Sequence, residues 1–186
     1  MATDIEILRQ MIRTENIIKP TEKNGKIELI LAEADYSVTV NGLSICDEFL
    51  VIKADKFDLS TSFFENRNEQ FKRADFIIVA ELNNRKVIIC LEMKAKKDHE
   101  NKILAQLKGA QCLVEYCKAL GKAFWNNKSF LTECTYHFVS IGHIKNSVKP
   151  NYTHADITHT HHEPKNLLKI AGARRIAFNQ LLSQLK

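Results

Sequence analysis

The chain has 186 residues, enough for one domain with a substantial core, and we expect residues 1–186 to form a single domain. Its 45% hydrophobic and 26% charged residues exclude a disordered or fibrous protein. The net charge of +5 leaves nucleic acid open as a partner, while the lack of a membrane-length apolar run and of a signal-peptide pattern predicts a cytoplasmic location.

The first part of the chain predicts one helix followed by a β-rich region. Residues 3–17 are amphipathic and begin with Thr3 or Asp4 as a cap. Residues 36–40 alternate apolar and polar side chains, as a half-buried strand does. The Asn41-Gly42 pair after them favours a hairpin turn, with residues 43–53 returning antiparallel. Residues 58–70 are polar and turn-like.

Residues 75–94 predict a second hairpin with charged groups at its open end. Two apolar runs, residues 76–80 and 87–91, flank a polar break at Asn83-Asn84. Asp75 opens the first run and Glu92-Met93-Lys94 ends the second. Since strand side chains alternate between faces, Glu92 and Lys94 share a face, and Asp75 lies near them if the strands pair in register. Two carboxylates beside an ammonium can hold a hard divalent cation and position a water.

A Glu-x-Lys motif is weak by itself, and its context decides its meaning. Glu163-Pro164-Lys165 also matches, but a proline in a His-rich polar stretch argues against a central strand. The Glu92 match instead ends an aliphatic run typical of a strand buried on both faces. An ionised group there is costly unless it is paired or binds metal. The alternative is an exposed Glu–Lys pair at a strand end.

The elements after the hairpin are a long helix and a strand. Residues 100–120 carry apolar side chains at steps of three and four, which predicts an amphipathic helix. Residues 136–141 predict a strand, residues 142–165 are polar and irregular, and residues 174–185 predict a closing helix. The apolar positions of the long helix are Ile103, Leu107, Ala110, Val114 and Cys117.

Ala74-Asp75 followed by Glu92-Met93-Lys94, with the helix and strand after it, resembles the core of the PD-(D/E)xK nuclease superfamily. The resemblance covers roughly residues 70–145. Ala74 stands where the name motif has proline. The resemblance implies an α/β restriction-endonuclease-like fold, in which a central mixed β-sheet is flanked by helices.

The same resemblance implies a Mg²⁺-dependent (or Mn²⁺-dependent) nuclease acting on DNA. Asp75 and Glu92 would bind the metal, with the main-chain carbonyl of Met93 as a further ligand. Lys94 would orient or help deprotonate the attacking water and counter charge on the phosphate. Members of the superfamily often direct a glutamine from the following helix at the site; Gln106 is favoured over Gln111 because it lies nearer the helix start.

Several biological settings and assemblies stay open under this reading. Restriction, antiphage defence and mobile-element functions are all compatible with a small nuclease. The chain could act as a homodimer or with a partner subunit. An extra carboxylate could come from the first helix or from the turn-like segment, and the sequence does not rank the candidates, which are Glu6, Glu15, Glu65 and Glu69.

Other residue clusters have simpler explanations. His154, His159, His161 and His162 lack a nearby cysteine and lie in a loop-like segment, so solvated histidines are favoured over a zinc site. The five cysteines are odd in number, and Cys90, Cys112 and Cys117 fall in apolar patterns, which predicts reduced core thiols. Lys96 and Lys97 are expected to be solvated.

The basic residues gather near the C-terminus. No acidic residue follows Glu163, whereas five basic residues do, and this segment accounts for the net charge. It could bind a phosphate backbone or be a solvated helix face. The five are Lys165, Lys169, Arg174, Arg175 and Lys186.

Two rival classes of function remain. One is a non-catalytic nucleic-acid-binding or assembly subunit that retains the nuclease fold. The other is an interaction protein in which Glu92 and Lys94 form a surface pair. An intact Asp75, Glu92 and Lys94 set counts against the first rival, because a structural role does not require charges at these positions.

Overall fold

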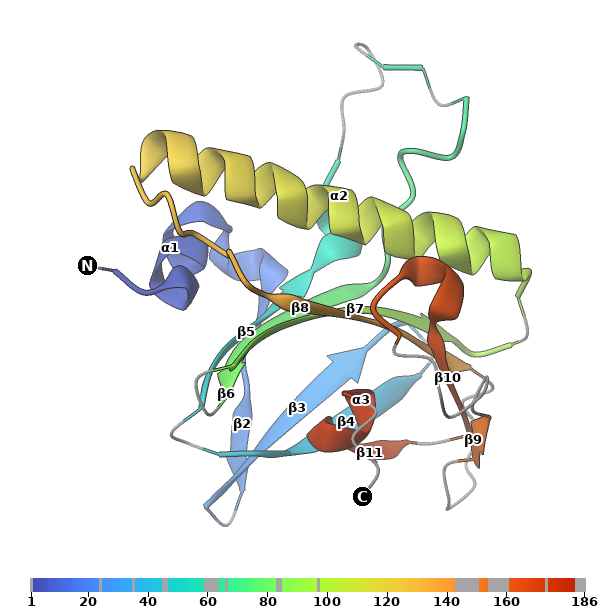
Figure 1. The fold of residues 1–186 in the computed structure, drawn as a ribbon. Helices are drawn as coiled ribbons and strands as arrows, with labels where there is room; N and C mark the ends of the chain where they lie inside the picture. Colours follow the sequence, from blue (N-terminus) through green and yellow to red (C-terminus); the bar gives the residue numbers. More distant parts are fainter. Residues whose placement is uncertain are drawn as a thin grey trace.

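The computed structural model describes residues 2–23, 25–34, 36–44, 47–58, 64–65, 67–82, 85–96, 98–142, 151–153, 161–172 and 174–182. They form an α/β structure with two mixed sheets and three α-helices (Figure 1). No helix in this part of the chain is long and apolar enough to cross a membrane. The elements are α1 (Asp4–Met11), β1 (Ile17–Ile18), β2 (Thr21–Lys23), β3 (Lys26–Ala32), β4 (Ser37–Leu43), β5 (Glu48–Lys53), β6 (Phe76–Leu82), β7 (Arg85–Lys94), α2 (Glu100–Phe124), β8 (Thr135–Gly142), β9 (Asn151–Thr153), β10 (Leu168–Ala171), β11 (Arg175–Ala177) and α3 (Phe178–Leu181), with 3₁₀ turns at Thr14–Asn16, Ala54–Lys56 and Pro164–Asn166.

The larger sheet has the strand order β1-β5-β6-β7-β8-β10-β9. Strands β5, β6 and β7 are antiparallel neighbours, whereas β7, β8 and β10 run parallel. The predicted hairpin of residues 76–91 is confirmed, with Phe76 opposite Leu91 and Ile78 opposite Ile89. These β-branched runs pack well on a pleated surface, and most of β7 is buried, as its continuous apolar run predicts.

The two faces of the larger sheet are covered differently. Even-numbered residues of β7, such as Ile88 and Cys90, pack against α1 and α2. Odd-numbered residues, such as Ile89 and Leu91, pack against the smaller sheet, whose order is β11-β4-β3-β2, and against α3. Figure 1 shows α2 lying across one face and β3 and β4 on the opposite side. The predicted central mixed sheet is present, but α1 and α2 lie on the same face, and the smaller sheet and the short α3 cover the other.

Helix α1 begins as predicted and ends earlier. Thr3 caps it in a capping box with Glu6. Prediction extended the helix to residue 17, but it ends at Met11. Asp4 Oδ2 accepts hydrogen bonds from Lys86 Nζ at 2.7 Å and from the Leu131 backbone N–H at 3.2 Å. Since Lys86 lies near the start of β7, α1 is anchored at the end of that strand opposite to Glu92.

The predicted hairpin turn at Asn41-Gly42 is wrong, because both residues lie inside β4. Gly42 has a φ of 92° and is the extra residue of a β-bulge, since β3 pairs Ile27 with Leu43 but Glu28 with Asn41. The positive φ that favours glycine in a turn here accommodates the bulge. Strand β5 therefore does not return beside β4 and instead joins the larger sheet.

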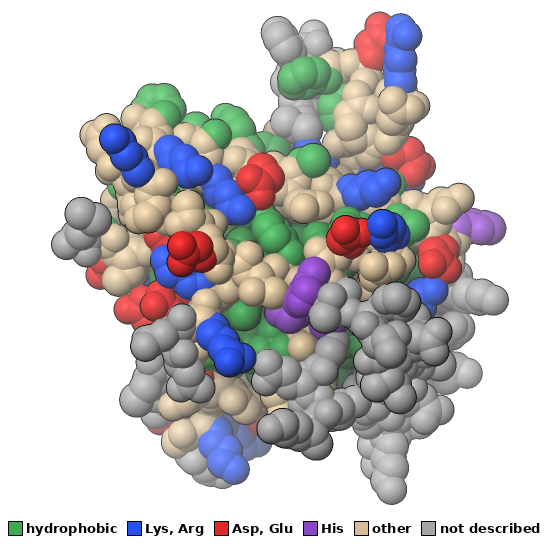
Figure 2. Space-filling view, in the orientation of Figure 1, with side chains coloured by type: hydrophobic (Ala, Val, Ile, Leu, Met, Phe, Trp, Pro, Cys, Tyr) green, Lys and Arg blue, Asp and Glu red, His purple; other side chains and the backbone are tan. Residues whose placement is uncertain are grey.

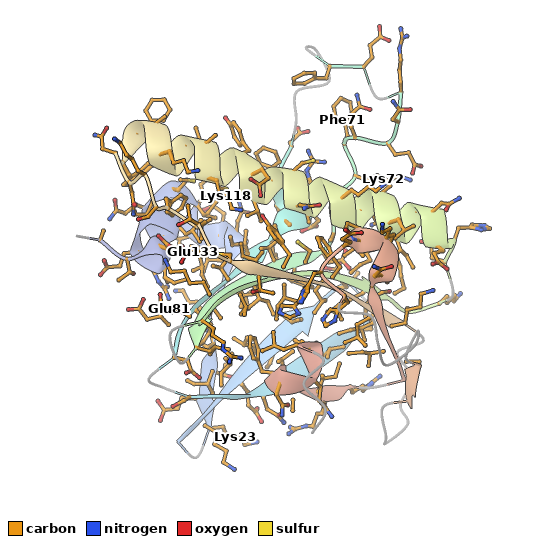
Figure 3. The ribbon with its side chains drawn as sticks, viewed as in Figure 1. Lys23, Phe71, Lys72, Glu81, Lys118 and Glu133 are labelled. Atoms are coloured by element: carbon orange, nitrogen blue, oxygen red, sulfur yellow. The ribbon has the colours of Figure 1, made fainter. Side chains whose placement is uncertain are left out.

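Helix α2 is the predicted helix of residues 100–120, continued to Phe124. A Cβ at Gly109 would lie 1.8 Å from the Lys72 carbonyl oxygen, so only glycine allows the segment before β6 to approach this closely. Figure 3 shows Phe71 and Lys72 on that segment, beside the helix. Gly109 thereby fixes the chain just ahead of Asp75. The fully or largely buried residues of the predicted stripe are Leu107, Ala110, Val114 and Cys117.

The predicted closing helix of residues 174–185 is wrong at its start and confirmed in part. Residues 175–177 form β11, which lies parallel beside β4, and residues 178–181 form α3. Strand β10, which was not predicted, pairs parallel with β8. Both strands are too short to show a periodicity, and their partners are far away in the sequence. Most of the irregular segment 142–165, and residues 183–186, lie outside the described residues.

The described cysteines are free thiols. Cys90 and Cys117 are buried, which agrees with the predicted core positions. Cys112 is exposed, so its prediction is wrong: it lies beside the apolar stripe of α2 rather than in it. Cys46 lies outside the described residues.

Candidate active site

The register of the hairpin brings the two acidic motif residues together. Because Phe76 pairs with Leu91, Asp75 follows opposite Glu92. Odd-numbered residues of β6 and even-numbered residues of β7 face the helices. By the same alternation, Asp75, Glu92 and Lys94 share that face. They lie at the strand ends next to α2.

Glu92 is fully buried. Its Oε1 forms an ion pair with the Lys94 ammonium, and its Oε2 has no hydrogen-bond partner. Burial raises the pKa of Glu92 above its ordinary value, and Lys94 opposes that rise only in part. An ionised oxygen without a donor is costly in the interior, so this carboxylate would be stabilised by a cation.

Asp75 lies opposite Glu92 and, like Glu92, is largely removed from water. Its Oδ2 accepts a hydrogen bond of 2.6 Å from the Met93 backbone N–H. Burial is the main cause that raises the pKa of Asp75, and the negative charge of Glu92 raises it further. Two carboxylates repel each other strongly where water is excluded. Both can be ionised together only with positive charge close by.

Lys94 supplies part of that positive charge. Besides the Glu92 ion pair, its Nζ lies 3.8 Å from Asp98 Oδ2, which also pairs with Lys102 at 3.1 Å. Burial alone would lower the pKa of Lys94, but the contact with Glu92 and the charges of Asp75 and Asp98 outweigh burial and raise it. Lys94 is therefore a stable cation near neutral pH, which favours charge neutralisation over proton abstraction as its role.

The Met93 carbonyl has a partner that sequence reasoning missed. The Tyr36 hydroxyl donates a hydrogen bond of 2.8 Å to Met93 O. Tyr36 precedes β4 in the smaller sheet, 57 residues away along the chain. A carbonyl oxygen has two lone pairs, so this bond orients the carbonyl and leaves one acceptor position. An isolated tyrosine before a strand gives no sequence signal for this contact.

A further carboxylate, Glu33, was also missed. It follows β3, and its backbone N–H donates to the Tyr36 carbonyl at 2.9 Å. Burial is the largest cause that raises the pKa of Glu33, followed by the charge of Asp55. Glu33 also contributes to the raised pKa of Asp75, and Lys94 acts on Glu33. The site therefore has a third carboxylate within electrostatic range, from the smaller sheet.

Gln106 lies on α2 where prediction placed it, next to Glu92. It contributes a small lowering of the pKa of Glu92, and its Nε2 is 3.5 Å from the Arg73 carbonyl oxygen. Its Oε1 is buried without a hydrogen-bond partner. Gln111 lies more than one helical turn further along α2, so Gln106 is the better placed of the two.

The four carboxylates considered from sequence as extra ligands are engaged elsewhere. Glu6 lies on α1, at the far end of β7, and Glu15 lies in the 3₁₀ turn Thr14–Asn16. The described part of the turn-like segment 58–70 makes local ion pairs. None of the four contributes to the pKa of Asp75 or Glu92. Their partners are Thr3 for Glu6, Arg13 for Glu15, Arg67 for Glu65 and Lys72 for Glu69.

The histidines are only partly as predicted. His154 and His159 lie outside the described residues. His162 is exposed, but His161 is buried, which contradicts its expected solvation. Its Nε2 lies 3.0 Å from His137 Nδ1 and 3.0 Å from the Leu181 carbonyl oxygen, and so links β8 to α3. Burial lowers the pKa of both His137 and His161, so the pair is neutral near pH 7.

The basic C-terminal residues do not form one surface in the described part of the chain. Figure 2 shows Lys and Arg interleaved with Asp and Glu along α2 and below it. Lys169 lies close to the site, whereas Arg174 and Arg175 lie at the smaller sheet. Lys186 is outside the described residues. The ion pairs are Lys165 with Glu163, Lys169 with Glu100 and Arg175 with Glu28.

The residues at the strand ends fit a hard divalent cation. Among the described residues, no three His, Cys, Asp or Glu side chains converge on one point. A cation would therefore be held by Asp75, Glu92 and the Met93 carbonyl, and oxygens from outside the protein would complete its coordination shell. Mg²⁺ is commonly bound in this way, through one or two carboxylates, water and substrate phosphate. The Glu92 Oε2 atom, buried without a hydrogen-bond partner, supports this fit.

Comparison of the sequence with protein-family models and curated proteins, and of the structure with solved structures, gave no match. The functional assignment therefore rests on the residues of the site.

Proposed function

We propose that the protein is a Mg²⁺-dependent nuclease that hydrolyses phosphodiester bonds in DNA. The observation that carries the proposal is the buried carboxylate of Glu92, which lies opposite Asp75, pairs with Lys94 through Oε1 and leaves Oε2 without a hydrogen-bond partner. A buried carboxylate with charged groups beside it is not needed to hold these strands together. It is the arrangement that a metal-dependent phosphodiesterase requires.

The fold around the cluster supports the same proposal. The motif hairpin β6-β7 leads into α2, and α2 into β8, which lies parallel beside β7. This order is the one that the PD-(D/E)xK resemblance implies. We propose that these elements are a restriction-endonuclease-like core, to which the smaller sheet adds Tyr36 and Glu33 near the site.

Each side chain has a distinct role in this proposal. Asp75, Glu92 and the Met93 carbonyl hold the cation, which when bound would lower the pKa of a water and stabilise charge on the phosphate. Tyr36 orients the Met93 carbonyl through its hydroxyl. Lys94, held protonated by its carboxylate neighbours, neutralises charge that develops on the scissile phosphate. Gln106 is placed to position Glu92 or the attacking water.

The test is incubation of the purified protein with plasmid, linear duplex and single-stranded DNA in Mg²⁺ or Mn²⁺. We expect cleavage with either ion and none with a chelator. An Asp75→Asn variant purified in parallel controls for contaminating nucleases and should leave every substrate intact. Cleavage that persists in the variant or in chelator would contradict the proposal. Intact plasmid, linear duplex and single-stranded DNA with both ions would contradict it as well.

A non-catalytic assembly subunit is the second candidate. The Glu92–Lys94 ion pair favours it, because that pair neutralises part of the buried charge without a metal. Such a subunit would still bind nucleic acid or a partner but would not bind Mn²⁺ through Asp75. Metal binding therefore separates the two candidates.

A further inference from the structure

A cavity of about 390 Å³ adjoins the proposed catalytic centre. It lies where β7, β8 and β10 end beside the first turns of α2, and Lys94 belongs to both the cavity wall and the centre. Its size is at the lower end of the range of about 300–1,000 Å³ for small-molecule sites. The lining residues that matter below are Lys94, Lys96, Lys169, Ile103, Leu167 and Gly142.

The cavity combines an apolar wall with a basic rim. Ile103 and Leu167 form part of the wall. Lys96 is exposed and has no ion pair with any described residue. Among the described residues Lys169 pairs with exposed Glu100 alone, at 2.9 Å. Exposed ion pairs are weak, so Lys169 can exchange this partner for a phosphate.

The acidic residues of the cavity are largely neutralised by their own neighbours. Asp98 lies between Lys94 and Lys102, and Glu100 pairs with Lys169. The α2 N-terminus, with its partial positive charge, also opens here, and its N-cap residue His99 makes no side-chain cap hydrogen bond. The rim therefore favours an anionic group, while the wall favours a flat apolar one.

The size of the cavity excludes a duplex. A cavity of about 390 Å³ has the size of a small-molecule site, which can take one nucleotide but not a duplex. A single unpaired nucleotide has the required shape and chemistry, since its base can lie against apolar side chains and its phosphate against lysines. We infer that the cavity binds one unpaired nucleotide next to the scissile phosphate, so that the preferred substrate is single-stranded rather than blunt duplex DNA. This inference rests on the proposed nuclease function.

Gly142 provides a direct way to fill the cavity. It ends β8 opposite Lys94, and a Cβ there would meet no atom within 4 Å. Gly142→Leu should therefore extend a side chain into the cavity, and Gly142→Ala is the matched control that adds one methyl group. Binding and cleavage would be measured for a short labelled single strand and for a blunt duplex of the same sequence, with Ca²⁺ replacing Mg²⁺ in the binding assays.

We expect the wild-type protein to cleave the single strand faster. Gly142→Leu should lower single-strand binding and cleavage by about tenfold or more, the scale of one lost base contact, with duplex cleavage and Mn²⁺ binding unchanged. Gly142→Ala should stay close to wild type. Equal cleavage of both substrates, or an unchanged single-strand preference in Gly142→Leu, would overturn the inference while leaving the nuclease proposal intact.

Two further results distinguish the nucleotide-binding inference from the nuclease proposal. If the protein binds the single strand in a Gly142-dependent way but cleaves nothing, the cavity is a nucleotide site and the nuclease proposal fails. If Gly142→Leu melts well below wild type, Lys169→Ala replaces it, with exposed Lys165→Ala as control. Lys169→Ala should weaken single-strand binding and Lys165→Ala should not; equal affinities of the two variants would overturn the inference.

Discussion

Replacing Glu92 by glutamine is expected to stabilise the metal-free protein while strongly reducing cleavage. The folded protein buries the Glu92 charge, which places the pKa of this group above its ordinary value of 4.5. A neutral amide of the same shape avoids that cost. We expect the free energy of unfolding to increase by about 1–3 kcal/mol at neutral pH, and the melting temperature to rise by roughly 3–10 °C. Cleavage should fall on the order of 10³-fold, since a principal metal ligand is lost.

The pH dependence of this stabilisation has a defined sign. In the folded state the pKa of Glu92 lies above that in the unfolded chain, so ionisation destabilises the fold as pH rises between the two values. The advantage of Glu92→Gln should therefore be small near pH 4 and largest above pH 7. Exposed Glu100→Gln is the control and should change stability by less than about 0.5 kcal/mol. A lower melting temperature for Glu92→Gln would indicate a structural ion pair instead.

Replacing Lys94 by methionine is expected to reduce cleavage on the order of 10²–10³-fold and to shift its pH profile. The Lys94 ammonium lowers the pKa of Glu92, so without it the carboxylate stays protonated to a higher pH. Because the metal needs the ionised form, the acid limb of the pH–rate profile should move to higher pH. A purely structural lysine would lower the melting temperature without moving this limb.

Lys94→Arg is the matched control for charge. Arginine keeps the positive charge but delocalises it over a planar guanidinium group, which cannot occupy the position of the lysine ammonium beside Glu92 Oε1. We expect the pH profile to stay near that of wild type and the rate to fall. Wild-type rates in Lys94→Met would remove this residue from the mechanism.

The parts of the fold that the sequence predicted are those with a local signal. The hairpin β6-β7 and helix α2 each have an apolar pattern within one segment, and their register follows from that pattern. Asn41-Gly42 was misread because a bulge and a turn both need a positive φ. Strand β11 was read as helix because its partner β4 is more than a hundred residues earlier.

The residues of the candidate site also divide into those with a local sequence signal and those without one. Asp75, Glu92 and Lys94 belong to one hairpin, so alternation along its strands was enough to place them on one face. Tyr36 and Glu33 reach the site from the smaller sheet, through a sheet-on-sheet contact that no short motif encodes. A carboxylate directly after an alternating strand was the only signal for Glu33.

The most direct test of the central claim is calorimetric titration with Mn²⁺ of the wild-type protein and of Asp75→Asn at pH 6 and pH 8. Since the pKa values of Asp75 and Glu92 are both raised, binding must displace protons, and we expect one site that binds more tightly at pH 8. Asp75→Asn should lose that site. Equal Mn²⁺ binding by both proteins, or none by wild type at either pH, would contradict a metal centre at Asp75 and Glu92.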